Sequence, residues 1–167
     1  MPKIILMMAA TIDGKIAKSS SHFPDLTSKE DKKEFLRLSK KSGAVIMGDK
    51  TFFTLPKPLP GRLNVVFTLL QKPPRIKGVK WVSGEPKKVL KELRKMGYKS
   101  TILGGSAYLN TLFLKKKLVD KIVLTIEPKI FGKGLSLFNE DFDLDLKLLS
   151  AKKINHNSII LRYKVLY

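Results

Sequence analysis

The amino-acid sequence predicts an α/β fold with a mostly parallel central sheet, flanked by helices and closed by a C-terminal antiparallel hairpin. Apolar runs recur along the chain, and they match central strands that are covered on both faces. Segments with helical spacing separate these runs, and this alternation is typical of a parallel sheet. The last part of the chain changes to two strand-like segments around a short polar turn.

The apolar runs are expected to form the central strands. They are Lys3–Thr11, Gly43–Gly48, Leu63–Leu69, Ser100–Leu103 and Asp120–Glu127.

Helical patterns lie between these runs. Thr27 and Glu30 form a capping-box pair, which predicts a helix with Thr27 as its N-cap. Pro86 opens a second helix that ends before Gly97, and another helix is predicted to begin at Gly105. The apolar faces of the last two helices consist of Val89, Leu90, Leu93, Leu109, Leu112 and Phe113.

The C-terminal segments Leu144–Ile154 and Ser158–Tyr167 are predicted to pair as an antiparallel hairpin around Asn155, His156 and Asn157. In the last strand one face is predicted to be fully apolar. It consists of Ile159, Leu161, Tyr163, Val165 and Tyr167. The proline-rich segment 55–62 is predicted to be a rigid loop.

The composition indicates one globular domain over residues 1–167. Hydrophobic residues make up 43% and charged residues 28%, which is close to ordinary globular usage. No apolar run approaches the roughly 18 residues that a membrane span needs, and no segment resembles a signal peptide. We therefore expect a cytoplasmic protein without membrane contact. With no cysteine and two histidines, neither disulfides nor a metal site are expected.

The formal net charge of +19 is almost entirely due to lysine. It indicates an anionic partner, or equally a lysine-coated surface without one, because the basic residues are spread over the whole chain. Arginine, which reads nucleic-acid bases through paired hydrogen bonds, is rare. Sequence-specific nucleic-acid binding is therefore not expected, although a basic nucleic-acid-binding protein on this scaffold is kept as an alternative.

Polar loops follow several of the predicted strands, and ligands bind at such loops in open α/β sheets. The loop 11–17 contains Asp13, and a plain Asp-Gly turn is the alternative explanation. Gly104 and Gly105 lead from a strand into a helix, where close backbone approach and the helix dipole favour a phosphate. An ordinary glycine turn explains this pattern equally well. After Gly48, Lys50 can offer a charge and Thr51 a hydroxyl to a phosphate.

Asp31 is the candidate proton carrier. With Thr27 as N-cap it lies in the second helical turn, on the apolar face of Phe35 and Leu38. A carboxyl group beside an apolar pocket has a raised pKa and can carry a proton near neutral pH. An acid that simply interacts with the helix dipole is the alternative.

The motifs resemble one superfamily when they are taken in order. Ala9–Ala17 (AATIDGKIA), Val45–Phe52 (VIMGDKTF), Pro58–Arg62 (PLPGR) and Gly104–Gly105 are similar to the dihydrofolate reductase superfamily. Leu118–Ile122 (LVDKI), Glu127–Gly134 (EPKIFGKG) and Leu137–Phe138 are more similar to the reductase (C-terminal) domain of the bifunctional riboflavin biosynthesis deaminase-reductase. The resemblance covers almost the whole chain and implies a dihydrofolate reductase-like fold.

The resemblance also implies an NADPH-dependent reductase, with NADH as an alternative cofactor. The implied cofactor-binding residues are Ala9 and Ile16 at the carboxamide, Gly48, Lys50 and Thr51 at phosphate, Thr68 near the adenosine 2′-phosphate, and Gly104, Gly105, Ser106 and Ala107 at the pyrophosphate. Thr11, Phe35 and Arg62 are expected at the substrate, with Arg62 matching the arginine that binds the glutamate of folate. Asp31 matches the acid that supports protonation, and Asp13 is the rival catalytic residue.

Two residues depart from the family pattern. Asp49 stands where dihydrofolate reductases usually carry a basic residue, and its charge would repel a 2′-phosphate. Leu103 stands where riboflavin-pathway reductases commonly have a glutamate that binds substrate. The first departure concerns the choice between NADPH and NADH, and the second concerns the pyrimidine substrate.

The expected reaction is hydride transfer from C4 of the reduced nicotinamide to a C=N or sugar C=O carbon, with a proton from Asp31 or an ordered water. The phosphate-bearing substrate 5-amino-6-(5-phosphoribosylamino)uracil, or the related diaminopyrimidine, is the first choice, and dihydrofolate is the alternative. A deaminase partner would be a separate chain, because the zinc-deaminase signature is absent from this sequence. A homodimer is expected, because riboflavin-pathway reductases are typically dimers and the C-terminal hairpin can pair across a two-fold axis.

Overall fold

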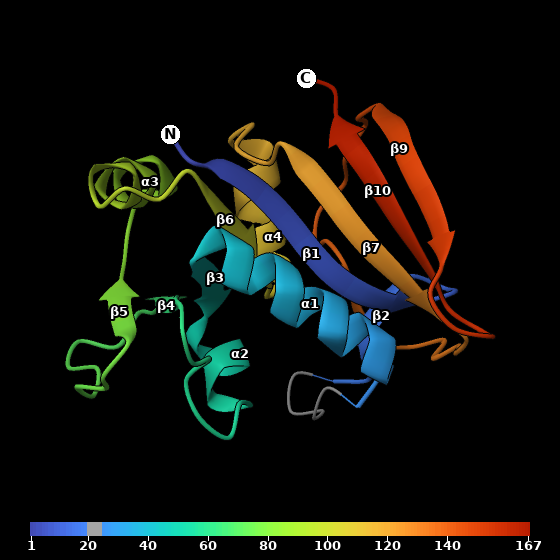
Figure 1. Cartoon of the computed structure of the whole chain (residues 1–167), viewed down its shortest axis with the longest axis horizontal. Helices are drawn as coiled ribbons and strands as arrows, with labels where there is room; N and C mark the ends of the chain where they lie inside the picture. The colour runs from blue at the N-terminus through green and yellow to red at the C-terminus, as the bar shows by residue number, and fades with distance from the viewer. Residues whose placement is uncertain (20–24) are drawn as a thin grey trace.

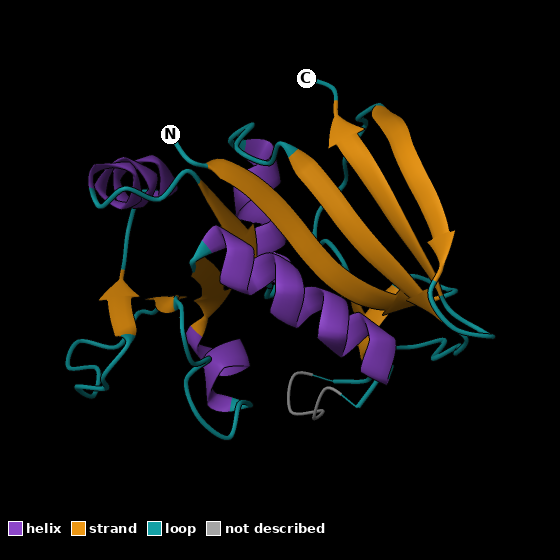
Figure 2. Ribbon diagram, viewed as in Figure 1, coloured by secondary structure: helices purple, strands orange, loops and turns teal. Residues whose placement is uncertain are grey.

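Strands and helices alternate over most of the chain (Figures 1 and 2). The computed structural model describes residues 1–19 and 25–167. The strands are β1 (Lys3–Thr11), β2 (Lys15–Ala17), β3 (Ala44–Gly48), β4 (Leu63–Phe67), β5 (Val79–Val82), β6 (Ser100–Leu103), β7 (Lys121–Glu127), β8 (Leu135–Ser136), β9 (Leu146–Lys153) and β10 (Ile159–Val165). The helices are α1 (Lys29–Ser42), α2 (Asp49–Phe53), α3 (Pro86–Lys95) and α4 (Ala107–Lys115).

Eight of the strands form one sheet in the order β5-β4-β3-β6-β1-β7-β10-β9. The pairs from β5 to β7 are parallel, whereas β10 runs antiparallel to both β7 and β9. β2 and β8 make a separate antiparallel pair. The predicted α/β class, with a mostly parallel sheet and a C-terminal antiparallel hairpin, is confirmed.

Helices cover both faces of the sheet, which explains why the central strands are apolar throughout. On one face Phe35 of α1 and Phe52 of α2 pack against a buried cluster that includes Val45. On the other face Leu93 of α3 and Phe113 of α4 belong to a second cluster. Figure 1 shows α1 across the near face of the sheet and α4 behind it. The carboxyl ends of the parallel strands remain as the edge at which loops can hold a ligand.

Two helices begin later than the sequence predicts. Ser28, rather than Thr27, is the N-cap of α1, because its hydroxyl accepts a 3.2 Å hydrogen bond from the Asp31 amide. Asp31 therefore lies in the first turn, not the second. α4 begins at Ala107 rather than Gly105, because Gly105 has a φ of +92°, outside the right-handed helical region.

The strand predicted over 63–69 ends at Phe67, and Leu69 is 95% exposed. The edge strand β5 was not predicted, because its residues are only half-buried and form no continuous apolar run. The predicted C-terminal hairpin is confirmed, and both faces of its last strand contribute to the core. Ile160 is completely buried in the cluster that packs against α1, Val165 is 5% exposed in the cluster on the other face, and Ile159 is 37% exposed.

Candidate functional site

The carboxyl end of β1 extends beyond its neighbour β6. Their pairing stops at Leu6 and Leu103, and β1 continues to Thr11 with β7 alone beside it. The Lys3 amide donates to Lys99 on the β6 side, and the Ile4 carbonyl accepts from Asp120 on the β7 side.

Backbone groups alternate between the two sides of a parallel strand, so Ala9 shares the β6 side with Lys3. The N–H and C=O of Ala9 therefore point to the side where β6 has already ended. This arrangement fits the implied role of Ala9 in binding a carboxamide through its backbone.

Two glycine turns meet beside this opening. The Gly48 amide donates to the Gly105 carbonyl at 3.0 Å, and the Gly104 amide donates to the Ile46 carbonyl at 2.9 Å. A Cβ added to Gly48 would lie 3.4 Å from Oγ of Ser106, which is the N-cap of α4. The turn after β3 and the start of α4 thus form one glycine cradle, and it lies at the N-terminus of α4, a position that suits a phosphate.

Ala107 is the first residue of α4, as expected for a residue that follows the phosphate-binding turn. Beyond the cradle, Asp49 begins α2 and its Oδ2 accepts a 2.7 Å hydrogen bond from the Thr68 hydroxyl. Lys50 is exposed, and Thr51 is half-buried in α2. Apart from Ile16 in β2, the residues implied to bind the cofactor therefore lie at or beyond the carboxyl ends of β1, β6, β3 and β4. Neighbouring strands lie about 4.8 Å apart, so this row spans about 14 Å and suits an extended dinucleotide.

Asp31 is 6% exposed at the start of α1. Its Oδ1 accepts a 2.5 Å hydrogen bond from the hydroxyl of Thr125 in β7. Burial raises the pKa of Asp31, the Thr125 hydrogen bond opposes this rise, and the negative charges of Glu127 and Glu34 add to it. Asp31 therefore has the environment expected of a carboxyl group that retains a proton.

Glu127 is a second buried carboxylate, which the sequence reasoning noted only within a motif. It is 2% exposed, and its two oxygens accept from the Ser28 amide at 2.8 Å and the Ser158 hydroxyl at 2.6 Å. Strand alternation places Glu127 on the same face of β7 as Thr125, which was the signal available in the sequence.

Asp13 has a different environment. Its carboxylate is exposed and accepts hydrogen bonds from the Thr11 hydroxyl at 2.6 Å and the amides of Phe131 and Gly132 at 3.2 and 2.7 Å. The Thr11 hydrogen bond is the main cause of a lowered pKa at Asp13. Thr11 is itself buried, and its hydroxyl also accepts from the Lys15 amide at 2.9 Å. The geometry thus favours a loop-fixing role for Asp13 and proton carriage by Asp31.

The remaining predicted residues lie at different distances from the cradle. The Phe35 ring is close to Gly104, since a Cβ added to that glycine would lie 3.8 Å from the ring. Ile16 lies half-buried in β2, which pairs with β8.

Arg62 is 8% exposed and donates to the Pro60 carbonyl at 3.1 Å and to the Ser39 hydroxyl. Burial lowers the pKa of Arg62. Since Ser39 follows Asp31 by two helical turns, Arg62 lies about 12 Å farther along α1.

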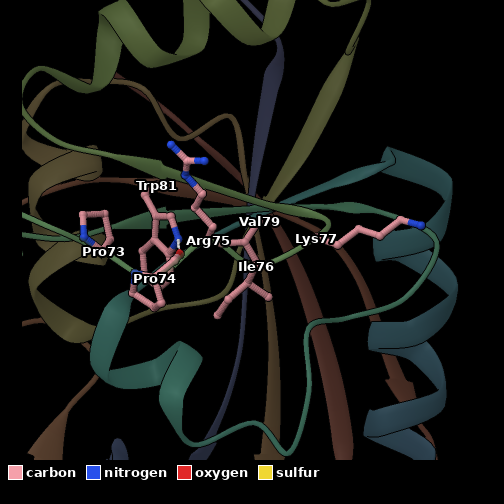
Figure 3. A pocket seen from close by; sticks show the side chains of 7 residues that line it. All are labelled: Pro73, Pro74, Arg75, Ile76, Lys77, Val79 and Trp81. Atoms are coloured by element: carbon pink, nitrogen blue, oxygen red, sulfur yellow. Dashed lines mark hydrogen bonds between the residues drawn. The ribbon is translucent and has the colours of Figure 1, made fainter.

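A cavity of about 540 Å³ lies outside this row of residues. It is lined from Pro73 to Trp81 beside the edge strand β5, and Trp81 donates to the Pro74 carbonyl at 2.7 Å. Figure 3 shows that the side chains of Arg75 and Lys77 point away from each other. Their charges do not converge on one ligand, and no predicted site residue lines this cavity.

Within residues 1–19 and 25–167, no group of His, Cys, Asp and Glu side chains is arranged to hold a metal ion. In the same part of the chain, no helix has the length and apolar character needed to cross a bilayer. The site at the carboxyl edge therefore consists of open backbone groups, glycine turns and buried carboxylates. This set fits a nicotinamide dinucleotide, because an open strand edge can bind a carboxamide and a helix N-terminus favours a phosphate.

The comparisons with known proteins agree with this geometry. The sequence profile of the RibD C-terminal domain matches residues 2–76 and 59–160. The riboflavin biosynthesis protein RibD of Aquifex aeolicus is 27% identical over 174 residues, which cover 81% of this chain and 49% of that protein. The chain therefore spans about half the length of this curated relative.

Two solved structures share the fold. A diaminohydroxyphosphoribosylaminopyrimidine deaminase/5-amino-6-(5-phosphoribosylamino)uracil reductase from Thermotoga maritima has a TM-score of 0.79 and 16% identity, over 99% of this chain and 57% of that one. Dihydrofolate reductase from Enterococcus faecalis, complexed with NADP(H), has a TM-score of 0.76 and 16% identity, over 99% of this chain and 97% of that one. The dihydrofolate reductase-like fold is thereby confirmed. Because the family profile covers nearly the whole chain, this protein belongs to the RibD C-terminal domain family.

Proposed function

We propose that this chain is an NADPH-dependent reductase of a phosphate-bearing pyrimidine. The observation that carries the proposal is the free edge of β1, where Ala9 offers its backbone N–H and C=O to a dinucleotide beside the glycine cradle. When bound, the reduced nicotinamide supplies a hydride from its C4. The open backbone of Ala9 would hold the carboxamide and so fix which face of the ring meets the substrate.

The proposed substrate is 5-amino-6-(5-phosphoribosylamino)uracil or the related diaminopyrimidine. Family membership supports this choice, and so does the Thermotoga maritima protein of the same fold, whose name includes this reductase activity. A net charge of +19 favours a substrate that carries a phosphate. Leu103 replaces the family's usual glutamate, so the pyrimidine would need another polar partner.

Asp31 is the proposed proton donor. Reduction of a C=N or C=O bond leaves an electron pair on nitrogen or oxygen, and that atom takes up a proton. Asp31 is buried against Thr125, the β7 residue that pairs with Ala9, and Thr125 holds its Oδ1, so its second oxygen can serve the substrate directly or through a water.

Dihydrofolate reduction is the second candidate. The observation in its favour is that Asp31 lies at the start of α1 and Arg62 contacts Ser39 farther along the same helix. An acid and an arginine spaced in this way could bind the two ends of a folate. Arg62 is, however, already bonded to Ser39 and Pro60, so binding a glutamate would require Arg62 to leave these partners.

The deciding experiment follows NADPH oxidation with the pyrimidine and with dihydrofolate in parallel. Oxidation with the pyrimidine alone supports the proposal, and oxidation with dihydrofolate alone supports the second candidate. Calorimetry that detects no heat with NADPH or NADH would contradict both, and salt-dependent RNA or DNA binding in that case would favour the nucleic-acid-binding alternative.

We also propose that the protein acts in the cytoplasm as a homodimer. The dimer is supported by the apolar side chains on the outer strand β9, where Leu146, Leu148 and Leu149 are 41%, 53% and 45% exposed. An unpaired edge strand with such side chains is suited to pairing with a second copy.

A further inference from the structure

Two buried carboxylates meet under the first turn of α1. Glu127 comes from β7 and Asp31 from α1, and Ser28 contacts both. The Ser28 amide donates to Glu127 Oε1 at 2.8 Å, while the Ser28 hydroxyl accepts from the Asp31 amide at 3.2 Å. Ser28, the N-cap of α1, therefore bonds to the Glu127 carboxylate and to the backbone of Asp31.

We infer that Glu127 is a positioning residue that keeps the exchangeable proton of this pair on Asp31. This inference deepens the proposed function, because it assigns the residue that prepares the proton donor for reduction.

The hydrogen bonds of the two acids are unequal. Both oxygens of Glu127 accept, one of them from a backbone amide that can only donate. Asp31 accepts from one side-chain donor, the Thr125 hydroxyl, which can rotate. Donors that point at a carboxylate stabilise its charged form, and Glu127 has more of them than Asp31.

The open oxygen belongs to Asp31. Its Oδ2 has no hydrogen-bond partner among the described residues, yet it is not one of their fully enclosed unsatisfied side-chain atoms. Asp31 is also the more exposed of the two acids, at 6% against 2% for Glu127, so its Oδ2 is the oxygen of this pair that a substrate or water can approach. A proton held there can be transferred, whereas a proton on Glu127 would be enclosed by Ser28 and Ser158.

Like charges in a buried pair oppose simultaneous ionisation, so one acid keeps its proton to higher pH. Burial, the charge of Glu127 and the charge of Glu34 all raise the pKa of Asp31, while Lys32 lowers it. Glu34 is itself bonded to Arg37 and to Arg162 of β10.

The test measures the titration of the carboxyl carbons by NMR in the full chain. In the native protein, the Asp31 carboxyl group is expected to keep its proton to higher pH than an exposed aspartate does, because its pKa is raised, and titration at or below the pH of an exposed aspartate would overturn the inference. This measurement needs no substitution and no substrate. It therefore remains decisive if the reductase activity is not found.

The matched variants are Glu127→Gln and Glu30→Gln. Glutamine can accept from the Ser28 amide and donate to the Ser158 hydroxyl, so Glu127→Gln removes the charge and preserves the contacts. Asp31 should then titrate at lower pH. Glu30 lies in the same helical turn but bonds to Asn155, so Glu30→Gln should leave the titration of Asp31 nearly unchanged. An equal shift in both variants, or none in Glu127→Gln, would contradict the inference.

If the reductase reaction is observed, the pH–rate profile provides a second readout. The descending limb, where Asp31 loses its proton, should move to lower pH in Glu127→Gln while the rate on the acid side stays the same. At pH values above the limb, the rate of Glu127→Gln should be about tenfold lower than the native rate for each pH unit by which the limb moves. A purely structural role of Glu127 would reduce thermal stability without moving the limb.

Discussion

The hydroxyl of Thr68 donates a 2.7 Å hydrogen bond to Asp49 Oδ2 and so joins the ends of β4 and β3 at the carboxyl edge of the sheet. Asp49 Oδ1 also accepts from the Lys50 amide at 2.7 Å. The carboxylate is thus held in place beside the residue that the family resemblance assigns to the neighbourhood of the adenosine 2′-phosphate. A fixed acid there interacts with a ribose hydroxyl more favourably than with a phosphate.

The first prediction follows from this charge. Asp49→Asn keeps an acceptor for Thr68 and removes the repulsion, so the ratio of NADPH to NADH affinity should rise about tenfold, or about 1.4 kcal/mol. Titration calorimetry with both cofactors measures the ratio. Thr68→Val, which keeps the acid, should not raise it. An unchanged ratio in Asp49→Asn would mean that the 2′-phosphate does not approach Asp49.

The second prediction separates cofactor binding from folding at the glycine cradle. Gly48 has an ordinary φ of −79°, and a Cβ there would lie 3.4 Å from Ser106 Oγ. Gly48→Ala should therefore fold with an unchanged or slightly higher melting temperature and show a smaller rise on adding NADPH. A β-branched residue at Gly105, with its φ of +92° and Met8 at 3.3 Å, should lower the melting temperature without any ligand. An unchanged response of Gly48→Ala to NADPH would place the phosphates elsewhere.

The sequence predicted the site's backbone better than its side-chain partners. Central strands could be recognised because burial on both faces produces a continuous apolar run in the sequence. The turns could be recognised because they need small residues, which appear there as glycines. Glu127 was overlooked because its partner Ser158 is 31 residues away, across the register of β7 and β10. The bond between Asp49 and Thr68 likewise depends on the parallel pairing of β3 and β4. Such long-range pairings have no local signal in one sequence.

The third prediction concerns Asp31. Asp31→Asn retains an oxygen that can accept from Thr125, but it cannot supply a proton. Turnover should fall by a factor on the order of 10² to 10⁴, with nearly unchanged NADPH affinity. Asp13→Asn should keep more turnover, because the Asp13 carboxylate holds Thr11 and Gly132 rather than a proton. Single-turnover rates and calorimetry on both variants make the comparison, and normal turnover in Asp31→Asn would remove its proposed role.

The same substitution should change the pH dependence of stability. The pKa of Asp31 is raised above its ordinary value of 3.8. The contribution of its protonation to the free energy of unfolding is therefore complete below pH 3.8 and is lost as pH rises through the folded-state pKa. Asn does not titrate, so the free energy of unfolding of Asp31→Asn should rise relative to that of the native chain as the pH goes from acid to neutral. Urea unfolding at several pH values measures the difference, and a difference that does not vary with pH would contradict the raised pKa.

The fourth prediction concerns assembly through β9. This strand is the edge of the sheet, and Leu148 on it is 53% exposed, so pairing with a second copy would satisfy its backbone and cover the apolar side chain. Light scattering at micromolar concentration should give the mass of a dimer. Leu148→Lys should give a monomer, because the interface would have to bury an unpaired charge. Leu36→Lys, at a 43% exposed position on α1, is the matched control and should remain dimeric. A native chain that is monomeric under these conditions would contradict the β9 interface and favour the dihydrofolate alternative, because most dihydrofolate reductases act as monomers.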